Sequence, residues 1–147
     1  MHDMSIWITP INLEEINQRG RNTLAEHLGI EFTEIGHNYL TAVMPIHQKL
    51  LQPMGIMHGG ASCALAETVG SVAANFCIDQ KLKACVGLDI NINHLRQVRS
   101  GVITATAKPL HLGKTTQVWE IKIQNDEQKL VAISRLTISV IDQNRLK

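Results

Sequence analysis

The chain has 147 residues, a formal net charge of +1 and only 3% aromatic residues. This length suggests one domain that can bury a substantial core. The near-zero charge excludes a strongly basic surface for nucleic acid or acidic membranes, and the scarcity of aromatic residues argues against a platform on which bases stack. We therefore expect a single domain over residues 1–147 that binds neither nucleic acid nor membrane.

The N-terminal composition and the cysteines indicate the cellular compartment. The first 25 residues contain several charged side chains and no apolar core of a signal peptide. No run of about 18 apolar residues predicts a membrane span. Cys63, Cys77 and Cys85 lie in apolar stretches and form no C-x-x-C pair, which fits reduced thiols. These features favour a cytoplasmic protein.

In chain order, the predicted elements begin with helix. Asn12 followed by two glutamates is typical of a helix start, so a short helix or helix pair is predicted from about 12 to 28, before Gly29. Two strands are predicted next, at 30–35 and 39–45. After a loop over 46–57, the apolar pattern predicts a long helix over about 59–78. Four strands are then predicted near 83–94, 101–110, 116–125 and 129–141. This order implies an α+β fold in which an antiparallel sheet wraps one central helix.

Two of the later strands carry informative patterns. The strand at 84–94 alternates, and one face is predicted to hold Val86, Leu88, Ile90, Ile92 and His94. The strand at 130–141 is apolar on both faces. A strand buried on both sides needs the helix on one face and another layer on the other. In so short a chain, we expect that layer to be a second subunit.

The predicted central helix contains one carboxylate, Glu67, with no basic residue near it in sequence. Small and apolar residues surround it, so we expect this helix to be buried on almost every side. A buried acid must be stabilised or used, and Glu67 is a candidate to attack a carbonyl or activate a water. Ser71 lies at i+4 and could orient the acid. The alternative is a structural acid, bonded to a strand amide or paired with Arg135.

The predicted start of this helix offers the second half of a site. Free N–H groups at a helix N-terminus carry partial positive charge, and Gly59 lets a substrate carbonyl come close to the backbone. Gln52 could donate a further hydrogen bond, or be an ordinary loop residue. His58 could fix the loop or polarise the carbonyl. A plain helix start in a tight turn is the alternative for the His-Gly-Gly sequence.

The spacing of the two groups has a geometric consequence. Gly59 and Glu67 are eight residues apart, which places them roughly 12 Å apart along a helix axis. Both cannot then touch one reacting carbon. If both act in one reaction, we expect them to come from different chains of a dimer with a site formed twice.

Other polar residues are less decisive. An isolated histidine on an apolar strand face, such as His94, is more often a core residue than a catalyst. The basic residues Arg96, Arg99, Lys108 and Lys114 near turns could receive phosphates, or be surface charge. The histidines lack metal-ligand spacing, so no metal is predicted. A nucleophilic Cys63 with His58 is disfavoured because Cys63 lies within the packing run.

Residues 52–62 (Gln-Pro-Met-Gly-Ile-Met-His-Gly-Gly-Ala-Ser) and 65–71 (Leu-Ala-Glu-Thr-Val-Gly-Ser) resemble the hotdog-fold acyl-CoA thioesterases. The nearer relatives are the PaaI-like and Arthrobacter-type 4-hydroxybenzoyl-CoA thioesterases, and nearest is the enterobacterial branch acting on 1,4-dihydroxy-2-naphthoyl-CoA or on aroyl groups of carrier proteins. Further matches lie at 86–96, 108–114 and 117–119, so the resemblance covers about residues 11 to 141. It departs at Ser71, often Thr in the Arthrobacter-type enzymes, and at Lys114, a small residue in some relatives.

The resemblance implies a helix wrapped by a sheet, paired into dimers and usually homotetramers. It implies catalysis by Glu67, an oxyanion contact at Gly59 assisted by Gln52 and His58, and a hydroxyl at Ser71. The substrate would be an acyl-CoA or acyl-carrier-protein thioester, with no cofactor beyond the substrate's CoA. The residues expected to contact substrate are Gly87, His94, Leu95, Arg96, Gln97, His111, Leu112, Gly113, Lys114, Thr115 and Thr116. A non-catalytic acyl-CoA-binding protein and a hotdog hydratase are the alternatives.

Overall fold

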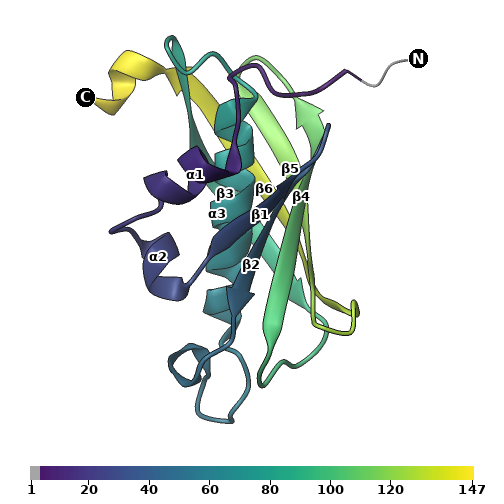
Figure 1. The fold of residues 1–147 in the computed structure, drawn as a ribbon. Coiled ribbons are helices and arrows are strands. Elements are labelled where there is room, and N and C mark those ends of the chain that lie inside the picture. The colour runs from purple at the N-terminus through teal and green to yellow at the C-terminus, as the bar shows by residue number, and fades with distance from the viewer. Residues whose placement is uncertain (1–3) are drawn as a thin grey trace.

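A computed structural model describes residues 4–147 of the protein. The elements in chain order are α1 (Leu13–Arg19), α2 (Leu24–Leu28), β1 (Glu31–Ile35), β2 (Leu40–Pro45), the 3-10 turn η1 (Gln48–Leu50), α3 (Gly59–Phe76), β3 (Lys83–His94), β4 (Val102–Leu112), β5 (Thr116–Gln124), β6 (Leu130–Asp142) and η2 (Gln143–Leu146). The predicted order of helices and strands is confirmed, with a pair of helices at the N-terminus (Figure 1).

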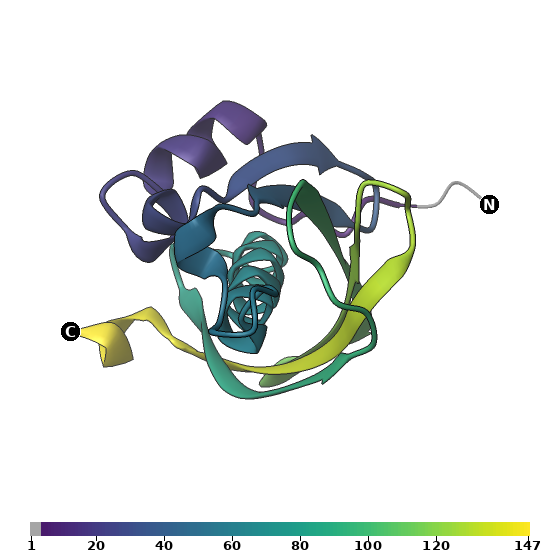
Figure 2. The same ribbon diagram turned by 90° about the horizontal axis from the view of Figure 1, so that it is seen from below.

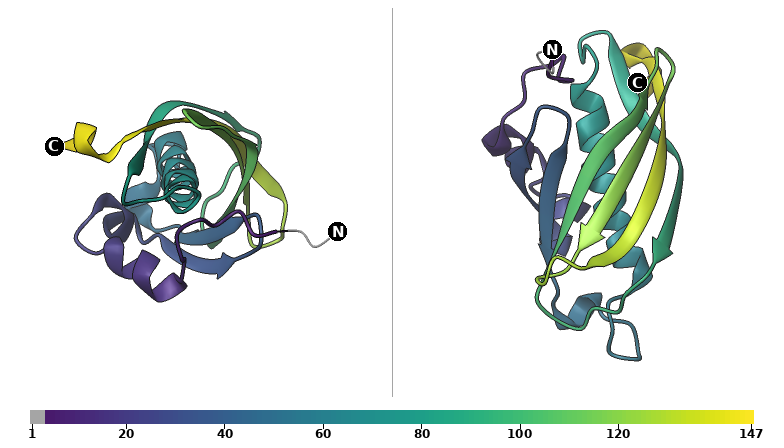
Figure 3. Two further views of the ribbon diagram at one scale, coloured as in Figure 1. Left: turned by 90° about the horizontal axis from the view of Figure 1, so that it is seen from above. Right: turned by 90° about the vertical axis from the view of Figure 1, so that its right-hand side faces the viewer.

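The strands form one six-stranded antiparallel sheet in the order β1-β2-β4-β5-β6-β3. The sheet curves around α3, as the two views along the helix show (Figures 2 and 3). The two edge strands are β1 and β3, and α1 and α2 lie on the β1 side. The predicted α+β arrangement, a sheet around one central helix, is therefore confirmed.

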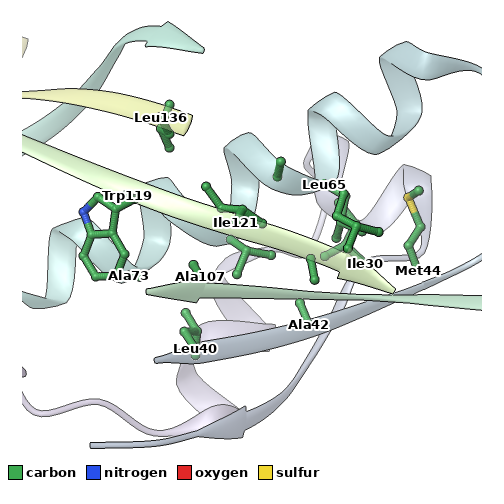
Figure 4. Packing of buried hydrophobic residues seen from close by; sticks show 14 of the residues in the cluster. Ile30, Leu40, Ala42, Met44, Leu65, Ala73, Ala107, Trp119, Ile121 and Leu136 are labelled. Carbon is green, nitrogen blue, oxygen red and sulfur yellow. The ribbon is translucent and has the colours of Figure 1, made fainter. Parts of the chain in front are cut away.

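The core fills the space between α3 and the concave face of the sheet (Figure 4). Leu65 and Ala73 of α3 face Ile121 and Leu136 of the sheet, and all four side chains are fully buried. Small residues on α3 let the strands approach it closely: a Cβ on Gly70 would lie 2.6 Å from Leu136 Cδ2. This is the close packing that the small-residue composition of the helix predicted.

One side of α3 remains uncovered, so the prediction of a helix buried on almost every side is wrong for the single chain. Half-buried or exposed residues recur every four positions, at 59/60, 63/64, 67/68, 71/72 and 75. This spacing makes one continuous strip along the helix, which we call the open stripe. It includes Glu67 and Ser71, and it exists because the sheet does not close between β3 and β1.

The predicted alternation of β3 is interrupted. A β-bulge lies between Gly87 and Asp89, where the pairing with β6 shifts by one residue. The bulge turns Leu88 outward, and its side chain is 68% exposed, while Ile90 and Ile92 pack against the core. Gly87 consequently faces α3, so the predicted grouping of Leu88 with Ile90 on one face is wrong.

The N-terminal segment fixes the far end of α3. The backbone N–H groups of Ile8 and Thr9 both donate to the Phe76 carbonyl, at 2.9 and 3.1 Å. The Thr9 hydroxyl donates to the Ile78 carbonyl at 2.7 Å. The two bonds to Phe76 satisfy a carbonyl that the helix C-terminus leaves without an intrahelical partner, and the bond to Ile78 holds the chain just beyond the helix. They give a physical reason why α3 ends at Phe76, two residues before the predicted end.

Candidate active site

The N-terminus of α3 is shaped by His58. Its backbone is extended, and its Nδ1 accepts a hydrogen bond of 2.8 Å from the Gly60 N–H. His58 is thus the N-cap of the helix, which agrees with its predicted role of fixing the loop. Within residues 4–147, the Gly59 N–H has no hydrogen-bond partner. A donor at the positive end of the helix dipole is therefore free to bind a ligand oxygen.

The imidazole of His94 covers Gly59. A Cβ at Gly59 would lie 2.8 Å from His94 Nε2, so no larger side chain fits without displacing the ring. The buried hydroxyl of Ser62 donates to the Gly59 carbonyl at 2.9 Å and lies 3.4 Å from His94 Nδ1. His94 itself is exposed. The interpretation of His94 as a core residue is therefore wrong, and the ring lies at the helix start.

The loop before α3 presents Gln52. Leu51 and Met57 form an isolated bridge that closes this loop. The Gln52 side-chain oxygen accepts from the Met54 N–H, which leaves its NH2 group available to donate. The Arg99 guanidinium donates to the carbonyls of Met54 and Gly55, at 3.4 and 3.1 Å, and so braces the loop. The Gln52 NH2 group thus has no hydrogen-bond partner among residues 4–147, and its role as a donor to substrate stays a prediction.

These residues share one hollow of about 430 Å³. We call it the donor half-site, and its predicted members are Gln52, Gly59, His94, Leu95, Arg96 and Gln97. Ile56, Met57 and Val98 add apolar wall. The structure thus brings together six of the residues predicted for catalysis or substrate binding.

Glu67 lies in a second hollow of about 460 Å³, which we call the acid half-site. Its other lining residues include Gly60, Cys63, Gly87 and the exposed apolar side chain of Leu88. Burial alone raises the pKa of the Glu67 carboxyl above its ordinary value. Among residues 4–147 no hydrogen bond or ion pair holds this carboxylate. An unpaired, partly desolvated carboxylate suits a base or a nucleophile.

The structure does not favour the two alternatives to a catalytic Glu67, which are an ion pair with Arg135 and a nucleophilic Cys63. Arg135 is exposed and stands beside Glu120 of β5 and Asn91 of β3 in the strand register, so its predicted pairing with Glu67 is not formed. Burial, and secondarily the Glu67 carboxylate, raises the pKa of the Cys63 thiol. A thiol with a raised pKa forms little thiolate, which argues against a cysteine nucleophile.

Ser71 lies one helical turn beyond Glu67 on the open stripe, in a hollow of about 210 Å³ that Ile16 and Arg19 of α1 help to line. Within the described chain, 4–147, no hydrogen bond joins Ser71 to Glu67. The predicted orienting contact is therefore not formed in the single chain.

The two segments predicted to hold the CoA arm are far apart. His94 stands in one row of paired residues with Ala132 and Ile123, and Gly87 stands in another with Ile138 and Gln117. The rows are six residues apart along β6, or roughly 20 Å. Residues 94–97 belong to the first row's end of the sheet and the turn at 111–116 to the second. One chain does not bring them together.

Comparison with known proteins shows the family of this chain. The family model described as "Thioesterase superfamily" matches residues 54–132, more than half of the chain. The chain belongs to the thioesterase superfamily.

Characterised and solved relatives agree. The 1,4-dihydroxy-2-naphthoyl-CoA hydrolase of Escherichia coli is 43% identical over 136 residues, which is 92% of this chain and 99% of that protein. The proofreading thioesterase EntH of Cronobacter turicensis is 41% identical over 136 residues, 92% of this chain and 98% of its own. A solved variant of a Pseudomonas aeruginosa thioesterase has a TM-score of 0.92 and 43% identity, covering 94% of this chain and 99% of that one. The protein is a thioester hydrolase with the hotdog fold.

Sequence reasoning missed the role of Ser62 and read Arg99 as a possible phosphate contact or as surface charge, not as a support for the loop. Ser62 connects His94 to Gly59 from within the helix, and Arg99 braces the Gln52 loop. The position of Ser62 three residues after Gly59 was a usable signal, since a hydroxyl there can reach the carbonyl at the helix start. Arg99 gave no such signal, because its partners are backbone carbonyls distant in sequence.

Within residues 4–147, no helix is both long and apolar enough to cross a bilayer.

The N-cap of this thioesterase can be tested through stability. Replacing His58 by alanine removes the acceptor for the Gly60 N–H, and we expect the free energy of unfolding to fall by about 1 kcal/mol. His58→Asn restores an N-cap acceptor and should recover most of that loss. Urea unfolding of the three proteins measures both changes. Equal stability of all three would show that the hydrogen bond contributes nothing, and slow turnover by a stable His58→Asn variant would assign the ring to the reaction.

Gly87 gives a second test within the thioesterase. A Cβ there would lie 2.2 Å from Glu67 Oε1, so Gly87→Ala must push the carboxylate aside. We expect thiol release to fall by roughly 100-fold, the effect of a displacement of about 1 Å in a catalytic group. Gly20→Ala is the matched control: Gly20 has a right-handed helical backbone, a Cβ there meets Asn17 O only at 3.4 Å, and the rate should stay unchanged. An active Gly87→Ala enzyme would argue against a role for this carboxylate.

Proposed function

We propose that the protein hydrolyses an acyl-CoA or acyl-carrier-protein thioester whose acyl group is aromatic, of the hydroxybenzoyl or dihydroxynaphthoyl type, or a medium-length chain. The observation that carries this proposal is the pairing of an unbonded helix-start N–H at Gly59 with an unpaired, partly desolvated carboxylate at Glu67. The first can hold a developing oxyanion and the second can drive attack on the same carbonyl.

In the proposed reaction, the thioester carbonyl oxygen accepts from the Gly59 N–H and from the Gln52 amide. Glu67 either attacks the carbonyl carbon to form a mixed anhydride or removes a proton from an attacking water. The thiolate then leaves without much help from an acid. Single turnover in labelled water separates the routes, since label found in the Glu67 carboxylate supports the nucleophile.

We further propose that each site combines the donor half-site of one subunit with the acid half-site of another. The edge strand β3 offers a way to do this, because both half-sites border it. Suppose that β3 pairs antiparallel with its own copy about a two-fold axis near Ile90 and Asn91. Position 87 of one strand then lies opposite position 94 of the other. The open stripes would then face each other, and the segments 94–97 and 111–116 of different subunits would approach. Assembly of two dimers into a homotetramer stays a prediction.

The substrate range is supported by the relatives and by the hollows. Two relatives are named for a dihydroxynaphthoyl-CoA substrate and for proofreading thioesterase activity. Val72 and Phe76 of α3 offer apolar wall beyond Ser71. Arg96, His111 and Lys114 are exposed and near turns, where they can meet the phosphates of CoA. We expect no cofactor beyond the CoA of the substrate, and a cytoplasmic location.

The test is free-thiol release from a panel of aroyl- and alkanoyl-CoAs. We expect rapid release, with aroyl substrates preferred. The comparisons favour hydrolysis over the alternative of a non-catalytic acyl-CoA-binding protein. Tight binding of the whole panel without thiol release would reverse that preference and overturn the proposal.

A further inference from the structure

The hollow beside Ser71 extends the open stripe away from the acid half-site. It lies between α1 and α3, and its lining residues are Ile16, Arg19, Ser71, Val72, Asn75 and Phe76. Ile16 and Phe76 are almost fully buried and make an apolar floor. Glu67, Ser71 and Asn75 follow at intervals of four residues on α3. An acyl group whose thioester carbonyl lies beside Glu67 can therefore extend along the helix into this hollow.

Arg19 is the one cation among the residues lining this hollow. Its guanidinium lies 5.3 Å above the centroid of the Phe76 ring, a distance at which a cation is attracted to an aromatic face. The same group donates to Gln80 Oε1 at 3.3 Å and pairs with Glu15. Three contacts therefore hold the Arg19 head at the end of the hollow. A guanidinium has five N–H donors, so several remain for a ligand.

Other polar groups in and beside the hollow already have hydrogen-bond partners. The Asn75 amide is already used, since it donates to the carbonyls of Ser71 and Cys85 and accepts from the Cys85 N–H. Gln80 is bonded to Arg19 and to the Asn75 carbonyl. The groups left to meet an acyl substituent are the Ser71 hydroxyl and the spare N–H groups of Arg19.

The positions of these two groups set the length of acyl group they can sense. Ser71 lies about one helical turn beyond Glu67, and Phe76, under Arg19, lies about two and a half turns beyond it. With a pitch of about 5.4 Å per turn, a single aromatic ring reaches Ser71, whereas a second ring is needed to reach Arg19. Because Glu15 balances the charge of Arg19, a neutral hydroxyl suits this end better than a carboxylate.

We infer that Arg19 is a specificity-determining residue that favours two-ring aroyl groups carrying a hydroxyl on the ring edge remote from the thioester. This inference rests on the proposed function and narrows its substrate class. The hydroxyl accepts a hydrogen bond from Arg19 while the second ring lies on Phe76 and Ile16. Recognition by a charged donor predicts discrimination of roughly 10- to 100-fold against the same ring system without the hydroxyl.

The experiment compares kcat/KM for 6-hydroxy-2-naphthoyl-CoA and 2-naphthoyl-CoA. Wild type is expected to prefer the hydroxylated substrate by at least about tenfold, and Arg19→Met to bring the ratio of the two kcat/KM values close to one. Arg21→Met is the matched control, since Arg21 lines a different hollow, and it should keep the wild-type ratio.

Each outcome has a distinct meaning. An unchanged ratio in an active Arg19→Met enzyme overturns the inference and leaves the proposed hydrolysis standing. Failure of wild type to release thiol from either substrate and from every member of the aroyl- and alkanoyl-CoA panel instead overturns the proposed function. If Arg19→Met folds poorly, Arg19→Lys supplies the second test: a lysine keeps the charge without the planar fork, so the ratio should fall to an intermediate value, and a ratio equal to that of wild type would overturn the inference.

Discussion

Replacing Glu67 by glutamine is expected to lower thiol release by roughly 10²–10⁴-fold, the range for loss of a positioned acid–base group. The substitution keeps the size of the side chain and removes only the ability to carry charge and attack or accept a proton. Free-thiol release under saturating acyl-CoA measures the loss. Glu14→Gln, an exposed glutamate in α1, is the control and should behave as wild type. Equal rates for the Glu67 variant and wild type would mean that another group is the catalytic acid.

The same variant should not be less stable. Burial raises the pKa of the Glu67 carboxyl, so the folded protein binds its proton more tightly than the unfolded chain does. The stability this group contributes is therefore fully present below the unfolded-state pKa and is lost as the pH rises through the folded-state pKa. Glu67→Gln should match or exceed wild type at neutral pH, and the difference should shrink in acid. The wild-type rate should fall on acidification through a pKa above the ordinary 4.5 of a glutamate.

Mixing two inactive variants is expected to restore activity. Gly59→Pro removes the proposed oxyanion N–H, and its ring also displaces the His94 imidazole, so it disables the donor half-site as a whole. The helix itself should persist, because proline is accepted at the first helical position and the extended backbone of His58 suits a following proline. Glu67→Gln removes the acid. A mixed dimer pairs the intact Gly59 of one chain with the intact Glu67 of the other and so rebuilds one of its two sites. After random exchange, about one quarter of wild-type activity should return.

The measurement is thiol release after co-refolding or co-expression of the two variants. The control is each variant refolded with itself, which should stay inactive. Activity no greater than the sum of these controls would place both groups in one chain and contradict the shared site.

Much of the fold could be predicted because its signals are local. The bounds of β3 at 83–94 are confirmed to the residue, since a charged loop precedes it and alternation runs to its end. The bulge at Leu88 could not be foreseen, because it depends on pairing with β6, which lies far along the chain. The open stripe was missed for a similar reason. Small residues predict close packing on α3, but only the curvature of the sheet decides which side stays uncovered.

The site was predictable in its residue types and less so in its contacts. Gln52, Gly59 and residues 94–97 could be picked out as candidates because a helix start and a strand end have recognisable sequence signals, and they line one hollow. The contact between His94 and Gly59 was not foreseen, since it joins segments that only the fold places together. The catalytic roles of Glu67, Gly59, Gln52, His58 and Ser71, and the sharing of one site between chains, stay predictions.

The position of β3 in the sheet also affects how the protein is made. Although β3 directly follows α3, its only strand neighbour among residues 4–147 is β6, the last strand to leave the ribosome. At about 5–20 residues per second, β3 waits several seconds for that partner. During this time the unpaired backbone groups along the edge of β3, and the side of α3 next to β3, are exposed to other chains. The two half-sites, which both border β3, are therefore completed last, and a chain that stops before Leu130 lacks the strand that pairs with β3 and protects it from aggregation.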